Sequence, residues 1–336
     1  MANKKQVKFG FGYTLINLGL DFSVENAKKY LGIVEELGLI EEGRPRPFVE
    51  VLLYHNPDEG LDLMDPNRSY LDKFKGMRKL FEKYGVDSKV LLFHGEGSGI
   101  DIGSPLGSQE HVMGYTTACS GLIVAQFLGS KDITGPWDAE QKKRRGFHQD
   151  AWDEGIKVVN ATAQELEVYA NIENLRKEEK RRNVIEPLLD DIDRLKLTHI
   201  KVQGDLCHFY ANDGQDLVST INMVKPYMRV LHVTEYGPWG SKINRGVLSS
   251  RPTAEVNPVS HQLPGVMEEL KDWKGVLSLE TPHPVFYGAV GRSDPVVWNQ
   301  PVDEHKYEFA KQETVQGFQR MRQCRGIVES DMNKKK

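Results

Sequence analysis

The sequence predicts an α/β fold of the (β/α)8 type, a TIM barrel, and three observations lead to this prediction. Eight short apolar runs of strand length alternate with longer segments whose apolar residues recur at helical spacing. The runs are apolar enough to be parallel strands buried on both faces. The chain has 336 residues, a length that single α/β barrels reach. We therefore expect one domain over residues 1–336, with the barrel at about 7–325 and a short disordered C-terminal tail.

The first half of the chain contains four of the predicted strands, and the fourth has the weakest pattern. Glycine stands near the expected ends of three helices, at Gly38, Gly85 and Gly129, where it is favoured as a stop. The strands are expected at residues 8–13, 47–54, 89–94 and 131–135, and the helices at 24–37, 69–84, 109–128 and 139–165.

The second half repeats the alternation more clearly. The strands are expected at residues 167–173, 198–205, 229–233 and 275–280, and the helices at 183–195, 216–223, 264–273 and 304–323, with a long loop at 235–258. An open doubly wound sheet is the competing architecture. The first strand is not followed by the GxGxxG turn that would support that alternative.

Composition narrows the class of protein. The net charge is -4 with both signs mixed along the chain, which weakly opposes nucleic-acid binding. No window approaches 18 uncharged apolar residues, so we expect no membrane span. The three cysteines are far apart and form no CxxC pair, and no signal peptide is visible. These features predict reduced thiols in a cytoplasmic protein.

Four polar residues stand at the ends of the last four predicted strands: Glu173, Asp205, His232 and Glu280. Catalytic groups of (β/α)8 barrels come from the C-terminal strand ends, so the fold would gather these side chains. Singly, each has an ordinary explanation, such as a helix cap for Asp205 or a buried, hydrogen-bonded ring for His232. Together, three carboxylates and one imidazole favour Mn²⁺, Mg²⁺, Co²⁺ or Fe²⁺ over a thiolate-rich zinc site, with Zn²⁺ as an alternative.

This ligand set suggests proton abstraction beside a carbonyl. A hard cation held by two vicinal sugar oxygens polarises the carbonyl and stabilises the enediolate that forms when the adjacent proton leaves. A ligand carboxylate can take that proton through its second oxygen. Glu173 and Glu280, on opposite sides of the site, could serve as base and acid on opposite faces of the substrate.

The motifs around these residues resemble the sugar phosphate isomerase/epimerase superfamily, the xylose-isomerase-like TIM barrels. They read I-E-N-L at 172–175, G-D-L-C-H at 204–208, L-H-V-T-E at 231–235 and L-S-L-E at 277–280. The resemblance is good over residues 167–281 and loose elsewhere. It implies a divalent metal, commonly Mn²⁺, on the four strand-end residues. It also implies that Glu173 and Glu280 handle protons, that His208 contacts substrate oxygens, and that the chain self-associates.

The sequence departs from this family at two places. Its keto-sugar epimerases often carry an arginine six residues after the metal histidine, where this chain has Pro238, although Arg245 is nearby. The block from 94 to 152 is unusually rich in Gly, His and Trp. We expect a wider aromatic pocket, with packing on the barrel loops as the alternative. The predicted lining residues are Trp137, Trp152, Trp239 and Tyr236, with Arg245 as a further substrate contact.

These departures fit the C-glycoside deglycosidase branch of the superfamily. Its catalytic subunits pair with a small β-rich subunit and cleave 3-oxo-C-glycosides of aromatic aglycones by proton abstraction and elimination. His94, which closes the third predicted strand, is a further candidate acid or base. His148 is expected at the surface instead.

Four functions stay open from the sequence. A sugar isomerase or epimerase, acting without a partner on a keto-sugar or sugar phosphate, is the first. The second is a lyase on an oxidised glycoside, in a hetero-oligomer with a small β-rich subunit. A metal-dependent endonuclease on the same barrel normally needs more His and Asp ligands and a basic face. The fourth, a non-enzymatic sugar-binding barrel, would be favoured by loss of a ligand, and all four ligands are present. A sugar or glycoside is the expected small-molecule substrate.

Overall fold

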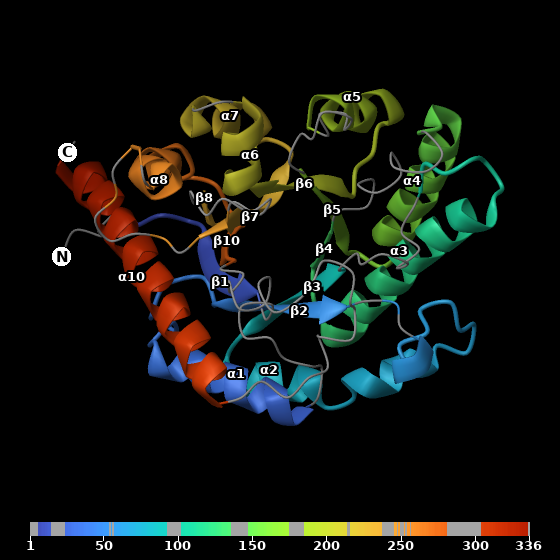
Figure 1. Cartoon of the computed structure of the whole chain (residues 1–336), viewed down its shortest axis with the longest axis horizontal. Coiled ribbons are helices and arrows are strands. Elements are labelled where there is room, and N and C mark those ends of the chain that lie inside the picture. The colour runs from blue at the N-terminus through green and yellow to red at the C-terminus, as the bar shows by residue number, and fades with distance from the viewer. Residues whose placement is uncertain are drawn as a thin grey trace. The chain divides into compact units, whose positions relative to one another are not determined.

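The structure is a computed structural model, and eight of its strands form a closed barrel in the order β1-β10-β7-β6-β5-β4-β3-β2 (Figure 1). The predicted barrel fold is therefore confirmed. The residues that the structure describes are 6–14, 24–53, 55, 57–92, 102–135, 147–174, 185–213, 216–236, 245–246, 248, 252, 254–255, 257–280 and 304–334.

Each barrel strand overlaps one of the predicted runs. The strands are β1 (Gly10–Thr14), β2 (Phe48–Leu53), β3 (Asp87–Leu92), β4 (Asp132–Gly135), β5 (Tyr169–Glu173), β6 (Ile200–Asp205), β7 (Met228–Val233) and β10 (Val276–Leu279). The described pairings between barrel strands are parallel. Side chains alternate between the two faces of a strand, so residues at every second position share a face.

The helices follow the strands along the chain. They are α1 (Val24–Glu36), α2 (Met77–Tyr84), α3 (Gln109–Leu128), α4 (Gln149–Glu165), α5 (Ile185–Leu195), α6 (Leu206–Asp213), α7 (Leu217–Val224), α8 (Pro258–Glu269) and α10 (Glu304–Lys334). The bounds of α3 match the prediction because its ends are well marked. Ser108 accepts a hydrogen bond from the backbone N–H of His111, and Gly129 closes the helix in the left-handed conformation.

In the first half of the chain, two predicted helices differ from the structure in their bounds, and after the sixth strand one helix was not predicted. Residues 69–84 are not one helix: a 3-10 helix (Ser69–Phe74) precedes α2, and Gly76 separates them at a φ of 88°. The described part of the segment 139–165 is helical from Gln149, where α4 begins. The prediction also missed α6, which begins directly after β6 and occupies residues that were left without an element.

The helix α8 begins earlier than the predicted 264–273. Pro258 occupies its first turn, where a proline is favoured, and Pro264 lies inside the helix. Proline has no N–H, so Pro264 cannot bond to the carbonyl oxygen of Ser260 one turn earlier. Arg320 of α10 donates to that oxygen instead, from Nη2 at 2.8 Å. A hydrogen bond from α10 thus compensates the bond that is missing at Pro264, the residue at which the sequence predicts the start of this helix.

Two further segments were predicted wrongly. The expected loop at 235–258 contains two short antiparallel strands, β8 (Glu235–Tyr236) and β9 (Arg245–Gly246). The helix α10 extends to Lys334 rather than ending at residue 323, so residues 326–334 of the expected disordered tail are helical. Side-chain contacts near the C-terminal end of α10 explain this extension.

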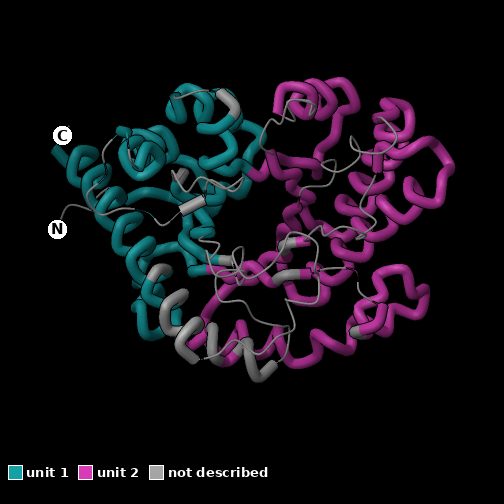
Figure 2. The backbone as a smooth tube through the Cα atoms, viewed as in Figure 1, with its two compact units in different colours: residues 1–20, 33–47, 204–336 teal, residues 21–32, 48–203 magenta. Residues whose placement is uncertain are grey.

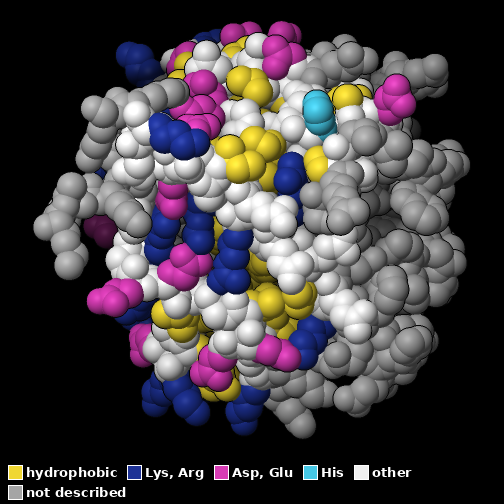
Figure 3. Space-filling view, turned by 90° about the vertical axis from the view of Figure 1, so that its left-hand side faces the viewer, with side chains coloured by type: hydrophobic (Ala, Val, Ile, Leu, Met, Phe, Trp, Pro, Cys, Tyr) yellow, Lys and Arg dark blue, Asp and Glu magenta, His cyan; other side chains and the backbone are white. Residues whose placement is uncertain are grey.

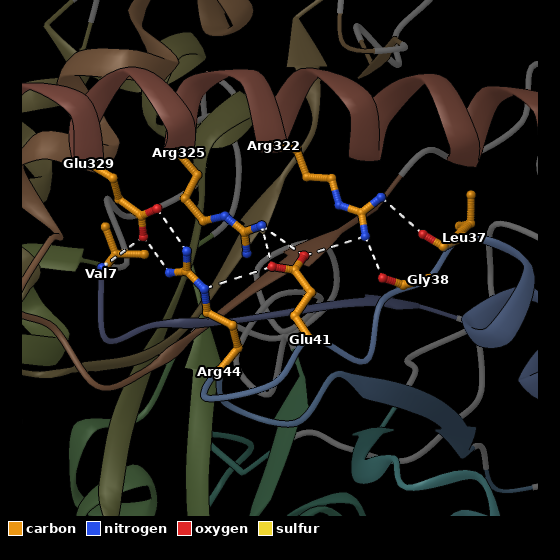
Figure 4. Close-up of polar contacts among 8 residues, drawn as sticks. All are labelled: Val7, Leu37, Gly38, Glu41, Arg44, Arg322, Arg325 and Glu329. Atoms are coloured by element: carbon orange, nitrogen blue, oxygen red, sulfur yellow. Dashed lines mark hydrogen bonds and ion pairs between the residues drawn. The ribbon is translucent and has the colours of Figure 1, made fainter. Parts of the chain in front are cut away.

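These contacts join α10 to the segment after α1 (Figure 4). Glu329 binds the guanidinium of Arg44, with Arg44 Nη2 2.7 Å from Oε2, and accepts the backbone N–H of Val7 at 3.0 Å.

Arg325 Nη2 donates to both carboxylate oxygens of Glu41 at 2.8 Å. Figure 4 also draws Arg322, which donates to the carbonyl oxygens of Leu37 and Gly38 at 2.9 and 2.6 Å. Charged pairs that are largely shielded from water thus hold the helix to residues far away in the sequence.

The chain divides into two compact units (Figure 2). One comprises residues 1–20, 33–47 and 204–336. Within it Tyr13 of β1 meets Phe318 of α10 edge to face, with ring centroids 6.1 Å apart. The other comprises residues 21–32 and 48–203. Within it α3 lies so close to the strands that a Cβ on Gly121 would come within 2.4 Å of Ile133 Cδ1. A larger residue at position 121 would therefore force the Ile133 side chain to shift.

The surface on the side of α10 carries both signs of charge (Figure 3). Lys and Arg side chains form a short file near the centre of this view, and Asp and Glu side chains lie beside them. This mixture agrees with the small net charge of -4. Among the described helices, none is long and apolar enough to cross a membrane.

Candidate metal centre

The structure brings together the four strand-end residues singled out from the sequence. One ligand atom from each of Glu173, Asp205, His232 and Glu280 lies within 4.8 Å of the others. Glu173 and Asp205 are the last residues of β5 and β6, His232 lies in β7, and Glu280 follows β10. These four strands are consecutive in the barrel order. The side chains are between 0% and 7% exposed.

Asp205 is fixed by the helix that follows it. Its Oδ1 accepts the backbone N–H groups of Cys207 at 2.8 Å and of His208 at 3.2 Å, in the first turn of α6. The helix-cap explanation and the ligand explanation for Asp205 are therefore compatible. One carboxylate oxygen satisfies the helix N-terminus, and the carboxylate stays within the cluster.

Gly204 makes the approach of α6 possible. A Cβ at this position would lie 2.8 Å from Leu231 Cδ1, 2.8 Å from Met228 Sδ and 2.9 Å from Phe209 Cε2. Any larger residue would force these three side chains to shift. The glycine before Asp205 in the sequence thus has a packing reason.

His208 lies beside the cluster, next to Asp205. Its Nε2 is 3.6 Å from Asp205 Oδ2, and its side chain is 13% exposed. The first turn of α6 carries both the N–H groups that fix Asp205 and this imidazole. Asp205 and His208 therefore keep a fixed relation to each other.

His232 and Glu280 form a close pair. His232 Nδ1 lies 2.9 Å from Glu280 Oε2. The backbone N–H of Glu280 donates to the carbonyl of Val233 at 3.3 Å, and Thr234 Oγ1 donates to the carbonyl of Glu280 at 2.7 Å. The ends of β7 and β10 are thus joined by main-chain and side-chain hydrogen bonds at the site.

The charge of the cluster suits a divalent cation. Three buried carboxylates this close repel one another unless protons or a cation neutralise them. Burial also removes the water that would otherwise solvate the charges. Oxygen donors with one imidazole match the preference of hard and borderline first-row cations, and no cysteine belongs to the set. The residues present therefore fit a divalent metal ion, without selecting one.

Other residues predicted for the site are placed only in part. The predicted positions His94, Trp137 and Trp239 lie outside the described residues. Tyr236 and Arg245 are backbone partners in the hairpin of β8 and β9, so the structure places their positions side by side. Separately, His148 is the N-cap residue of α4, with its side chain partly exposed and its N–H bound to the carbonyl of Gly103.

Sequence reasoning gave no role to two neighbours of His232. Thr234 and Glu235 are 0% and 1% exposed, and both side chains make hydrogen bonds to other elements. The available indication was the motif L-H-V-T-E at 231–235, which contains both residues. Their partners are distant in the sequence, however, so the contacts could not be predicted.

His55 also follows a barrel strand and was not singled out. Its Nδ1 accepts the backbone N–H of Leu63 at 3.1 Å, which leaves the proton on Nε2 in the neutral ring. Burial lowers the pKa of this imidazole, and the nearby carboxylate of Asp62 opposes the shift only in part. The neutral form is therefore favoured at neutral pH.

The barrel and its cluster define an α/β barrel with a group of acidic and histidine side chains that could bind a divalent cation. The family of xylose isomerase-like TIM barrels matches residues 47–306, more than half of the chain. The chain therefore belongs to that family. No curated protein sequence matches it.

Solved structures with the same fold include several sugar epimerases. A structure of L-ribulose 3-epimerase has a TM-score of 0.65 at 13% identity, over 96% of this chain and 97% of that one. D-psicose 3-epimerase from Clostridium cellulolyticum H10, solved with D-tagatose, has a TM-score of 0.61 at 13% identity, over 93% and 99%. The IolI protein with a bound zinc atom has a TM-score of 0.59 at 13% identity, over 91% and 97%. At this identity the similarity shows the fold alone.

Proposed function

We propose that the protein is a divalent-metal-dependent enzyme that moves a proton at the carbon next to a carbonyl of a sugar, and so isomerises or epimerises it. The observation that carries this proposal is the cluster itself. It contains two glutamates from different strands, with Asp205 and His232 as the remaining ligands. Membership of the family and the epimerases among the structural neighbours support the substrate class.

Glu173, Asp205, His232 and Glu280 would hold the metal ion, and Mn²⁺ is the first choice for a test, with Mg²⁺, Co²⁺, Fe²⁺ and Zn²⁺ as alternatives. A bound ion would supply Lewis-acid polarisation of the substrate carbonyl and charge stabilisation for the enediolate. Because the ligand side chains are buried, bulk water would have little access to this chemistry.

The chain's own residues would perform the proton transfers. One glutamate takes the proton from the carbon beside the carbonyl, and the C–H electron pair moves into the carbonyl to give the enediolate. The other glutamate, in its acid form, returns a proton to the opposite face, which inverts that carbon. Glu173 and Glu280 are proposed for these two roles. His208, beside Asp205, is proposed to orient substrate oxygens.

Solvent exchange tests this proposal directly. The purified protein is incubated in D₂O with Mn²⁺ and a panel of ketoses and 3-oxo-glycosides, and NMR follows the positions next to the carbonyl. We expect deuterium to enter one carbon of at least one ketose, together with formation of its epimer or aldose isomer. If deuterium enters none of the substrates with any of the five metals, the proposal is contradicted.

A second candidate is cleavage of a 3-oxo-C-glycoside by the same proton abstraction followed by elimination. The observation that favours it is the sequence departure at Pro238, where keto-sugar epimerases often have arginine. The electron pair of the abstracted C–H bond would form the new double bond, and the carbon–carbon bond to an aromatic aglycone would break with its electron pair on the aglycone carbon. The second glutamate, in its acid form, would give that carbon a proton and so complete the free aglycone. Release of free aglycone from a 3-oxo-C-glycoside, measured by chromatography, distinguishes this outcome from epimerisation.

A further inference from the structure

Thr234 and Glu235, which follow His232 closely in the sequence, form hydrogen bonds to two different elements. Thr234 is fully buried, and its Oγ1 donates to the carbonyl oxygen of Glu280 at 2.7 Å. The parallel register between β7 and β10 ends at Val233 and Leu279. The threonine hydroxyl therefore continues the connection between the two strands beyond the end of the ladder, at the residue that belongs to the cluster.

Glu235 fixes the same segment from its other side. Its Oε1 and Oε2 accept the backbone N–H groups of Val259 and Ser260 at 3.0 and 2.9 Å. Both groups lie in the first turn of α8, whose N-cap residue Asn257 makes no side-chain cap. The carboxylate of Glu235 thus replaces a local cap, and its charge is favourable at a helix N-terminus.

The helix α8 is itself held in place. The carbonyl oxygen of Ser260, left without its helical partner by Pro264, accepts Nη2 of Arg320. Glu235 therefore binds to a helix end that is attached to α10 rather than to a free turn. The segment 232–235 is held at Thr234 by the end of β10 and at Glu235 by α8.

We propose that Thr234 is a positioning residue that sets the relation between the two cluster members His232 and Glu280, and that Glu235 holds it in place. His232 Nδ1 and Glu280 Oε2 are 2.9 Å apart, so a small shift of either backbone changes the space available to an ion. Groups that orient metal ligands typically contribute about 10- to 100-fold in metal affinity. This inference depends on the metal site of the proposed function, and not on which sugar is the substrate.

Three variants test the role of the hydroxyl. Thr234→Val keeps the shape and removes the donor, and Thr234→Ser restores it. Thr220→Val is the matched control, because Thr220 is 8% exposed and donates to a carbonyl, that of Asp216, at 3.0 Å in the same compact unit. The readouts are the Mn²⁺ dissociation constant from calorimetry and the visible spectrum of Co²⁺ at saturation. Neither requires turnover.

We expect Thr234→Val to weaken Mn²⁺ binding by about 10-fold or more, and to alter the Co²⁺ spectrum. Thr234→Ser should restore both, and Thr220→Val should change neither even if it lowers the melting temperature. Glu235→Gln replaces one acceptor by an NH₂ group facing the helix N–H groups, and should weaken Mn²⁺ binding in the same direction. It also serves as the second variant if Thr234→Val does not fold.

Unchanged Mn²⁺ affinity and Co²⁺ spectrum in Thr234→Val, or an equal loss of affinity in Thr220→Val, would overturn the positioning role. A wild-type protein that binds no divalent cation would overturn both this role and the proposed function. Tight Mn²⁺ binding that depends on Thr234, without solvent exchange into any sugar, would overturn the proposed reaction and leave the positioning role standing.

Discussion

At the scale of single residues, the two glutamates of the cluster have the clearest test. Glu173→Gln and Glu280→Gln keep the side-chain volume but remove charge and basicity. If these carboxylates transfer protons, each change should reduce kcat by about 10²- to 10⁴-fold, the usual contribution of a general acid or base. Steady-state kinetics on the substrate found by the exchange assay measures the effect.

The control for these variants is Glu167→Gln, in the same stretch of sequence as Glu173. The side chain of Glu167 is 84% exposed, and its lysine partner is 3.8 Å away. This variant should match the wild type. Activity near that of the wild type in both Glu173→Gln and Glu280→Gln would exclude proton transfer by either carboxylate.

The identity of the cluster residues could be predicted from the sequence, whereas their mutual contacts could not. Glu173, Asp205, His232 and Glu280 each end or nearly end an apolar run, and the barrel fold makes such ends converge. Thr234 bonds to a residue 46 positions away, which no local pattern indicates. His94, Trp137 and Trp239 lie outside the described residues, so their part in the site stays a prediction.

At the scale of elements, strands were easier to predict than helix bounds. Parallel strands buried on both faces require apolar runs, and such runs are visible in any sequence. Helix ends depend on single contacts. The start of α8 is capped by Glu235, and its passage through Pro264 is compensated by Arg320, which lies in another helix. The length of α10 depends on pairs such as Glu329 with Arg44.

The pair of Glu329 and Arg44 should make stability depend on pH. Burial raises the pKa of Glu329, but the Arg44 guanidinium and the N–H of Val7 outweigh it, so that the pKa lies below its ordinary value. A carboxyl whose folded-state pKa is lowered stabilises the fold above its unfolded-state pKa, about 4.3 for Glu, and this contribution is lost as the pH falls through the folded-state value.

We therefore expect Glu329→Gln to lower the free energy of unfolding at pH 7 by about 2 kcal/mol, because Arg44 would be left partly buried without its charged partner. The difference from the wild type should shrink below pH of about 4.3. Urea unfolding at pH 7 and at pH 3.5 measures it. The matched control Glu82→Gln breaks an exposed pair with Arg78 and should cost at most about 0.5 kcal/mol. An equal loss in both variants, or a loss independent of pH, would contradict this account.

At the scale of the whole molecule, we predict self-association, or association with a second, small β-rich chain. The connections from β3 to α3, at residues 93–108, and from β7 to α8, at residues 234–257, are long for connections between a strand and a helix, and long connections tend to be functional. Light scattering on the purified chain measures its state of assembly. A chain that gains activity only with a small co-expressed protein would select the C-glycoside cleavage over the epimerase. A monomer that is fully active alone would exclude an obligate partner, and these segments would then act only on their own active site.

Metal binding should also increase the free energy of unfolding of the whole chain, because the cluster forms only in the folded state. An ion that binds only the folded state stabilises it by about 2.7 kcal/mol at 100 times its dissociation constant. We expect the melting temperature to rise with Mn²⁺ concentration and to fall again when a chelator is added.

Asp205→Asn is the informative variant. Its side-chain oxygen can still accept the N–H groups of Cys207 and His208, so the helix cap is kept. One of three crowded charges is removed, so the metal-free variant should melt at or above the temperature of the metal-free wild type. Its melting temperature should then respond weakly to Mn²⁺. An equal rise in the variant and the wild type would mean that Mn²⁺ binds elsewhere, and no rise in the wild type with any of the five cations would contradict the metal centre.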